Sequence, residues 1–387
     1  METCERQVSH YLYCALSREQ LKTITITDPS TDYSRAKNDE QFQKISLLMT
    51  KSSLSIVMRS CNDRDRIGAA IESILSQSYS DFELLILDDS STDGTPEVIR
   101  AFADSRIRLI IHDQDRGKAA TLNEGVELCT RPLIVRMDPC NISHPWRLEK
   151  LVAYMENHPG CMAAGSWIKW MDADGKYLRV EGAADEALYF HFIFKPCLRD
   201  FSMLYRKQAI LSVGGYCYAD QEDLIWRIML RFRVHVLEEP LQGAMLSGDP
   251  AVSGAGSLAE SVAGAGFPAP LDGFLRERDT LSDEARYCLS NHFWPSAGRP
   301  RLKEVYQTLT MLETITARIT TLENPNRSAD TIRSLAREKQ RHIIRNVATQ
   351  LPFTKMWQLV THFNQPTLGL KQTLVRMRLN PRKPYYY

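Results

Sequence analysis

Acidic side chains that follow apolar runs are the first candidates for chemistry in this sequence. The run FELLILDD contains Asp88, and PLIVRMDPCN places Asp138 and Cys140 two positions apart. Two acids spaced in this way after a strand can hold a hard divalent cation. Here Cys140 stands in the place of the second acid, and a thiol is a poor ligand for Mg²⁺. The pattern therefore predicts a metal site with one weakened ligand.

The elements that position these residues are short apolar runs alternating with amphipathic stretches. LSIVM, FELLILDD, IRLIIH and PLIVRMD have the length of buried strands, whereas DRIGAAIESILSQSY has helical periodicity. This alternation is typical of a parallel sheet covered by helices on both faces. Ligands of such α/β sheets bind outside the carboxyl ends of the strands. We expect Asp88 at that edge, where it can accept hydrogen bonds from a base or ribose, while Ser91, Thr92 and Asp93 cap the helix that follows.

Four motifs resemble those of family 2 glycosyltransferases with the GT-A fold. They are SIVMRSCN, AIESILSQSYSDFELLILDDSSTDGT, RGKAATLNEGVELC and the acid motif at Asp138, in the order of the family. The resemblance covers residues 54 to about 246, about half of the chain. It implies a doubly wound mixed sheet that binds a nucleotide-diphospho-sugar over the first four strands. It also implies sugar transfer to an acceptor hydroxyl, usually with inversion.

The same resemblance assigns roles to individual residues. Asp88 would hold the nucleobase, and Asn62 would line the nucleotide cleft. Lys118 and Asn123 would face this cleft from the next helix. Asp138 keeps the place of the first acid in the metal motif.

Two residues after Asp138 depart from the family pattern. Cys140 and Asn141 stand where the family has acids, so we expect any Mn²⁺ or Mg²⁺ to bind weakly or only with the donor. A second Asp-Ala-Asp sequence, at Asp172 and Asp174, is followed by Gly between two strand-like runs. It predicts a hairpin turn and not a replacement metal site.

An inverting transferase needs a carboxylate as general base beside the acceptor hydroxyl. The family has an acidic pair after Gly-Gly-Tyr, and this chain has GGYCYADQEDLIWRI. Aligned on Arg227, the position of the base falls on Gln221, which cannot take a proton. Asp220 precedes it, and a helix starting one turn later would make Glu222 and Asp223 the acidic pair. The sequence leaves the register open.

Composition and segment character indicate four regions. They are an N-terminal extension (1–52), a glycosyltransferase-like domain (53–246), a linker rich in small residues (247–273) and a helical, basic C-terminal region (274–387). Nine scattered cysteines with no CxxC pair argue against a disulfide framework and a structural zinc site. With neither a signal peptide nor a long apolar run, we expect a cytoplasmic protein.

The C-terminal tail has an unusual charge. Residues 331–387 contain eleven basic side chains and a single acid, Glu338, interleaved with aromatic residues. This mixture favours an anionic membrane surface at the inner face of the membrane, where lipid-linked acceptors reside. Nucleic acid ranks well below, because no motif that reads it accompanies the charge. The alternative is that helices fold back on the transferase domain with their basic face in water.

Two functions remain open at this point. The first is a glycosyltransferase that builds a polysaccharide or glycoconjugate on a saccharide or lipid-linked acceptor. The second is a glycosyltransferase-fold protein that binds a nucleotide-sugar or a protein partner without turnover. Met245 and Ser247 favour the second, since the family often has Arg-x-His there, with the His reaching the metal.

Overall fold

The computed structural model describes a defined part of the chain, namely residues 53–172, 174–217, 222–245, 283–291, 300–322, 324–326, 328–348 and short pieces up to 363. The predicted extension (1–52) and linker (247–273) lie outside the described residues, as does the tail beyond 363. Asp220, Gln221 and Ser247 also lie outside them.

Four parallel strands form the first half of one nine-stranded sheet, in the order β3-β2-β1-β4. Their bounds are β1 Leu54–Ser60, β2 Phe82–Asp89, β3 Ile107–His112 and β4 Leu133–Met137. The connecting helices are α4 Arg64–Leu75, α5 Thr95–Arg100 and α6 Lys118–Leu128. β1, β2 and β4 are buried almost throughout because helices cover both faces of the sheet. The α/β, doubly wound arrangement predicted from the sequence is confirmed.

The second half of the sheet is mixed and continues in the order β4-β8-β6-β9-β5, with β7 beside β6. Its strands are β5 Asn141–Ser143, β6 Cys161–Met171, β7 Tyr177–Glu181, β8 Leu204–Arg206 and β9 Arg233–Met245. Its helices are α7 Arg147–Asn157, α8 Leu188–Phe194, α9 Lys207–Ser212 and α10 Glu222–Met229, with 3-10 turns η2 Asp185–Ala187 and η3 Asp200–Ser202. β6 and β7 pair as an antiparallel hairpin, and Asp172 Oδ1 accepts hydrogen bonds from the backbone N–H groups of Asp174 and Lys176. The turn predicted there is confirmed.

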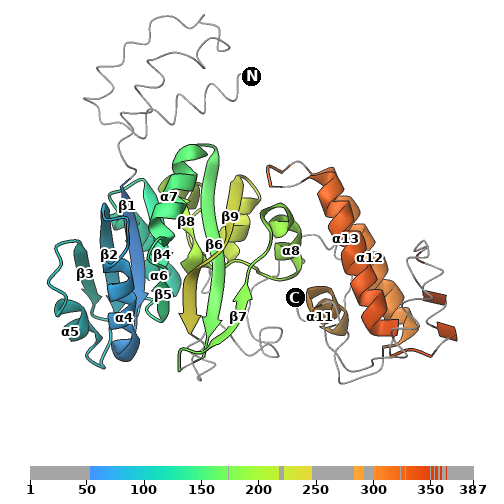
Figure 1. Ribbon diagram of the computed structural model, residues 1–387, viewed down its shortest axis with the longest axis horizontal. Coiled ribbons are helices and arrows are strands. Elements are labelled where there is room, and N and C mark those ends of the chain that lie inside the picture. Colours follow the sequence, from blue (N-terminus) through green and yellow to red (C-terminus); the bar gives the residue numbers. More distant parts are fainter. Residues whose placement is uncertain are drawn as a thin grey trace, which may run out of the picture.

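Three further helices pack against this sheet domain beside α8, on the side away from β3 (Figure 1). They are α11 Asp283–Asn291, α12 Leu302–Thr321 and α13 Ala329–Ala348. Ile315 of α12 and Ile343 of α13 belong to the same buried cluster as Phe190 of α8. Asn326, between α12 and α13, donates to the carbonyl of Met229 at 2.8 Å. The apolar faces of these helices are therefore buried against the protein itself.

Two buried clusters lie on the two faces of the sheet. One contains side chains of α4 and α7, and the other contains side chains of α6, α8, α10 and the C-terminal helices. This double cover holds the parallel strands rigidly and leaves their carboxyl ends for polar residues. Within the described residues, no helix combines the length and hydropathy needed to cross a membrane.

Candidate functional site

The carboxyl ends of the first strands meet at one edge of the sheet. In the parallel registers, Ser60 of β1 lies beside Asp88 of β2, and Asp89 lies beside His112 of β3. Asp138 directly follows β4 on the other side of β1. Residues from four separate segments are thus brought to a common edge, which is where ligands bind in open α/β sheets.

Two loops at this edge are joined by hydrogen bonds. Asn62 and Ser90 have positive φ values of 56° and 58°, a conformation that Asn tolerates well. The Asn62 backbone N–H donates to Ser91 Oγ at 2.8 Å, and Asn62 Oδ1 accepts from the Thr92 N–H at 2.9 Å. Asn62 is exposed at the edge, as expected, but its side-chain oxygen fixes the loop conformation.

The N-cap of α5 is Gly94, so the predicted capping by Ser91, Thr92 or Asp93 is wrong, but Asp93 holds the first residue of the helix. Its Oδ1 accepts hydrogen bonds from the backbone N–H of Thr95 at 2.9 Å and from the Thr95 hydroxyl at 2.6 Å. Ser91 and Thr92 instead bond to residues of the neighbouring loops. The turn is therefore held by several segments at once.

Asp88 is completely buried at the end of β2. Its Oδ1 accepts hydrogen bonds from the hydroxyls of Ser60 at 3.0 Å and Ser91 at 2.6 Å, and its Oδ2 accepts from the Ser91 N–H at 3.0 Å. A carboxylate can accept about four hydrogen bonds, so one position on Oδ2 is left for a ligand donor. Asp88 thus fixes the loop at Ser91 and can still accept one hydrogen bond from a nucleobase.

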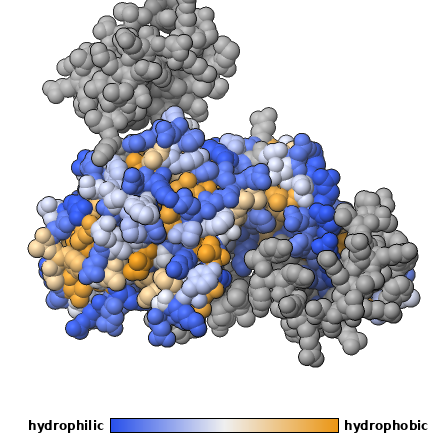
Figure 2. All heavy atoms as spheres, in the orientation of Figure 1, coloured by the Kyte–Doolittle hydropathy of each residue, from blue (hydrophilic) through white to orange (hydrophobic). Residues whose placement is uncertain are grey.

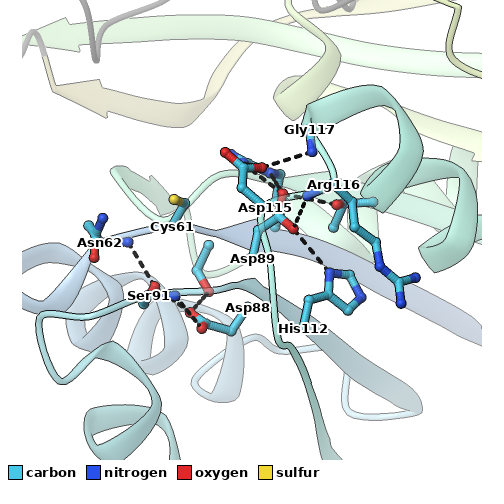
Figure 3. A network of polar contacts seen from close by, with 12 residues as sticks. Cys61, Asn62, Asp88, Asp89, Ser91, His112, Asp115, Arg116 and Gly117 are labelled. Carbon is cyan, nitrogen blue, oxygen red and sulfur yellow. Dashed lines mark hydrogen bonds and ion pairs between the residues drawn. The ribbon is translucent and has the colours of Figure 1, made fainter.

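Asp89 is the second buried acid at this edge and points to the opposite side (Figure 3). Its oxygens accept hydrogen bonds from Arg59 Nε at 2.9 Å, the Arg116 N–H at 3.0 Å and the Thr121 hydroxyl at 3.0 Å, and His112 Nδ1 lies 3.0 Å away. Burial alone would raise the pKa of Asp89, but these donors hold it well below its usual value. Asp89 therefore stays ionised and anchors the loop that leads into α6.

Asp138 lies at the end of β4 in an ion pair with Arg136. Its Oδ1 is 2.7 Å from Arg136 Nη2, and its side chain is 18% exposed. Burial would raise the pKa of Asp138, whereas the charges of Arg136, Lys118 and Arg59 keep it below its usual value. The charge of Lys118, at the start of α6, therefore acts on Asp138.

The residues after Asp138 do not form a good cation site. Burial raises the pKa of the Cys140 thiol to about 12, so Cys140 is neutral and a weak ligand. Asn141 Oδ1 accepts the Cys140 thiol at 3.6 Å, and its buried Nδ2 has no hydrogen-bond partner within the described residues. Across those residues, no cluster of three or more His, Cys, Asp or Glu side chains could hold a metal.

Asn123 of α6 is bound to the Gly-Gly-Tyr turn by two hydrogen bonds. Its Nδ2 donates to the carbonyl of Tyr216 at 2.8 Å, and its Oδ1 accepts the Tyr216 N–H at 2.8 Å. Gly215 precedes this contact with a φ of +70°, and a Cβ there would lie 2.4 Å from Asn123 Oδ1. The Gly-Gly-Tyr turn therefore needs glycine, and Asn123 fastens it to α6.

The candidate bases at α10 are both in ion pairs. Glu222 Oε1 lies 3.2 Å from Arg199 Nη1, and Asp223 Oδ2 lies 2.8 Å from Arg227 Nε. Arg227 also donates to the carbonyls of Val213 and Gly215, so Asp223 takes part in holding the glycine turn. Residues 218–221 lie outside the described residues, so the register of the acidic pair stays a prediction.

Several polar residues of this region escaped sequence reasoning. Arg136 is fully buried and donates from Nε to Asp200 at 2.7 Å. The hydroxyls of Tyr205 and Tyr216 donate to Asp200 Oδ1 at 2.7 Å and 3.2 Å. One signal was present, since Arg136 interrupts an otherwise apolar strand, LIVRM, and a buried charge requires a partner.

A family model described as glycosyl transferase family 2 matches residues 55–214. The UDP-Glc:alpha-D-GlcNAc-diphosphoundecaprenol beta-1,3-glucosyltransferase WfgD of Escherichia coli is 34% identical over 181 residues, which cover 46% of this chain and 70% of WfgD. The chain belongs to glycosyltransferase family 2. The mixed sheet is the GT-A arrangement, so this fold prediction is confirmed.

Other relatives match over shorter stretches. EpsE of Bacillus subtilis is 38% identical over 125 residues, 32% of this chain and 45% of EpsE. For the first relatives found, the match thus spans about half of their length. A crystal structure of S. aureus TarS residues 1–349 with UDP-GlcNAc aligns with a TM-score of 0.47 at 14% identity, over 77% of this chain and 90% of that one.

Proposed function

We propose that this family 2 glycosyltransferase transfers a sugar, with inversion, from a nucleotide-diphospho-sugar to an acceptor hydroxyl in polysaccharide or glycoconjugate synthesis. The observation that carries the proposal is the convergence of Asp88, Asp138 and Lys118 at one edge of the sheet. WfgD, by its name, uses UDP-Glc and a lipid-linked saccharide, which supports a donor and acceptor of these classes.

In this proposal the donor lies across the ends of β1, β2 and β4. Asp88 accepts a hydrogen bond from the nucleobase through its remaining capacity, and Asn62 shapes the loop beside it. Lys118 attracts the diphosphate from the start of α6, where the N-terminal end of the helix also favours negative charge. Asn123 acts indirectly, by fixing the Gly-Gly-Tyr turn.

Glu222 is the general base that we favour. Asp223 is largely buried and committed to Arg227 within its own helix, whereas Glu222 is half-buried at the helix start. Arg199 Nη1 lies 3.2 Å from Glu222 Oε1 and orients this carboxylate. Asp220 lies outside the described residues and stays a candidate by its position in the sequence.

A divalent cation, Mn²⁺ or Mg²⁺, would be weakly bound or donor-dependent. It would meet Asp138 through one oxygen, because Arg136 takes the other and Cys140 is a protonated thiol. The diphosphate would supply the remaining ligands. The chemistry of such a cation is to neutralise the leaving diphosphate.

A second candidate function is donor binding without turnover. The specific observation in its favour is that Glu222 and Asp223 are both paired with arginines, while Gln221 occupies the aligned place of the base. A panel of nucleotide-sugars tested for thermal stabilisation, with and without Mn²⁺, identifies the donor. Release of nucleoside diphosphate from that donor supports transfer, whereas stabilisation with no release supports binding alone.

The acceptor side of the proposal includes an anionic membrane surface at the cytoplasmic face and no nucleic acid. Arg333, Arg337, Arg341 and Arg345 recur every fourth residue along α13, and this part of the surface is mainly hydrophilic (Figure 2). Because the apolar face of α13 is buried in the protein, its contact with lipid would be electrostatic. Sedimentation with anionic liposomes that high salt abolishes supports this, and full-length protein that never sediments with them rules it out.

A further inference from the structure

Arg136 is a charged residue in the middle of the sheet. Its side chain is fully buried between the ends of β1 and β4. Nε donates to Asp200 at 2.7 Å and Nη2 donates to Asp138 at 2.7 Å. Nη1 donates to the carbonyls of Val57 at 3.1 Å and Met137 at 2.6 Å. All three nitrogens of the guanidinium are therefore committed to acceptors.

The two acids that share Arg136 differ in their surroundings. Asp200 is 1% exposed and receives further hydrogen bonds from the hydroxyls of Tyr205 and Tyr216, yet burial raises the pKa of Asp200 above its usual value. Asp138 is partly exposed at the donor edge, and among the described residues its side chain accepts no other hydrogen bond. Arg136 is thus the one direct partner of Asp138 found there.

This pairing changes what Asp138 presents to a diphosphate. An unpaired carboxylate repels a diphosphate, and a cation bridging the two removes that repulsion. A guanidinium in a short ion pair removes much of it by neutralising the carboxylate. The neighbouring Asn141 adds a buried N–H donor without a partner, which suits a phosphate oxygen and not a cation.

We propose that Arg136 takes over the neutralisation of Asp138, so that the donor diphosphate binds this edge without needing a divalent cation. This rests on the proposed nucleotide-sugar function. Arg136 acts as a positioning residue, because it fixes Oδ1 of Asp138, and among the described residues Oδ2 accepts no hydrogen bond. Through Asp200 and Tyr216 it also connects the donor edge to the Gly-Gly-Tyr turn that Asn123 holds.

The test is calorimetric binding of UDP and of GDP in EDTA and in Mn²⁺. For the wild-type protein we expect dissociation constants in the two buffers that differ by less than about threefold, since about 1.4 kcal/mol corresponds to tenfold. Arg136→Met leaves Asp138 unpaired, so binding in EDTA should weaken at least tenfold and Mn²⁺ should restore most of the loss. Tyr205→Phe is the matched control, because it removes a donor to Asp200 without touching Asp138. Its ratio between the two buffers should equal that of the wild type.

Asp138→Asn keeps the test decisive where Arg136→Met fails to fold. The amide cannot repel phosphate, so binding in EDTA should be unchanged or tighter, with no gain from Mn²⁺. Wild-type binding that requires Mn²⁺ overturns this inference alone and leaves the proposed function standing, as does Mn²⁺-dependent binding lost in Asp138→Asn. Wild-type protein that binds neither nucleotide in either buffer overturns the proposed function and this inference with it.

Discussion

The two halves of the sheet hold their polar residues in different ways. At the parallel half, Asp89 and Asp138 pair with arginines of their own or a neighbouring strand, and Asn62, Asp88 and Asp93 are fixed by hydrogen bonds between loops that the strand order already brings together. At the mixed half, Glu222 and Asp223 are held by arginines, one of them from an irregular segment.

This difference separates binding from turnover. The carboxyl ends of neighbouring parallel strands always lie at the same edge of a sheet. The donor edge, formed by the carboxyl ends of β1, β2 and β4, therefore follows from the fold itself. The position of a base near α10 depends instead on individual side-chain pairs, and one replacement there, such as Gln221, alters the chemistry while the fold remains. The donor edge is therefore the more robust part of the proposal, and α10 is where it is most easily broken.

The largest effect is expected at Glu222. Glu222→Gln removes the proposed base while keeping a hydrogen-bond acceptor for Arg199, so kcat should fall by about 10²–10⁴ with little change in donor KM. Asp223→Asn is the neighbouring control and should lower stability more than kcat, because it weakens the hold of Arg227 on the glycine turn. Steady-state kinetics and thermal unfolding distinguish the two. Full activity in Glu222→Gln would contradict the assignment of Glu222 as the base and leave Asp220 as the candidate.

A smaller effect is expected at the donor edge. Asp88→Ala should weaken nucleoside diphosphate binding at least tenfold, about 1.4 kcal/mol, because the base loses its acceptor and Ser60 and Ser91 lose theirs. Asp93→Asn disturbs the same loop through the hydrogen bonds between Asp93 and Thr95 and serves as control. Calorimetry on both variants decides the assignment. Equal affinities for wild type and Asp88→Ala would remove Asp88 from the nucleotide site.

The sequence predicted the parallel half well because its strands are buried on both faces and read as continuous apolar runs. It predicted the positions of Asp88 and Asp138 for the same reason. The stretch from 182 to 203 had no such pattern, since α8 and η3 are short elements stabilised by tertiary contacts. Hydrogen bonds between residues far apart in the chain could not be predicted from the sequence either. Examples are Arg136 with Asp200 and Asn123 with Tyr216. These pairs have no signature in the local sequence, because the two residues of each pair are brought together only when the chain folds.

A further contrast concerns how the C-terminal helices are attached to the mixed half. Lys339 of α13 is 3% exposed, and its ammonium group lies 4.4 Å from the centre of the Phe194 ring on α8. Burial lowers the pKa of Lys339 to about 7, with Cys288 opposing and Lys195 adding to this shift. His191 of α8 lies near Lys339, and burial lowers the pKa of His191 to about 4. Its imidazole is therefore uncharged near pH 7.

The smallest effect is therefore a dependence of stability on pH. Between pH 7 and the ordinary lysine value of about 10.5, the unfolded chain binds a proton at Lys339 that the folded chain does not. Stability should rise with pH across this window, by up to about 1.4 kcal/mol per pH unit, and this contribution should level off below pH 7, where both states are protonated. Lys339→Met removes the slope, whereas Lys303→Met, at an exposed lysine of α12, keeps it. Denaturant unfolding at pH 6, 7, 8 and 9 measures the difference. A wild-type stability that is flat from pH 7 to 9 would show that Lys339 stays charged in the folded protein. The protonated ammonium group of Lys339 would then pack against the Phe194 ring of α8.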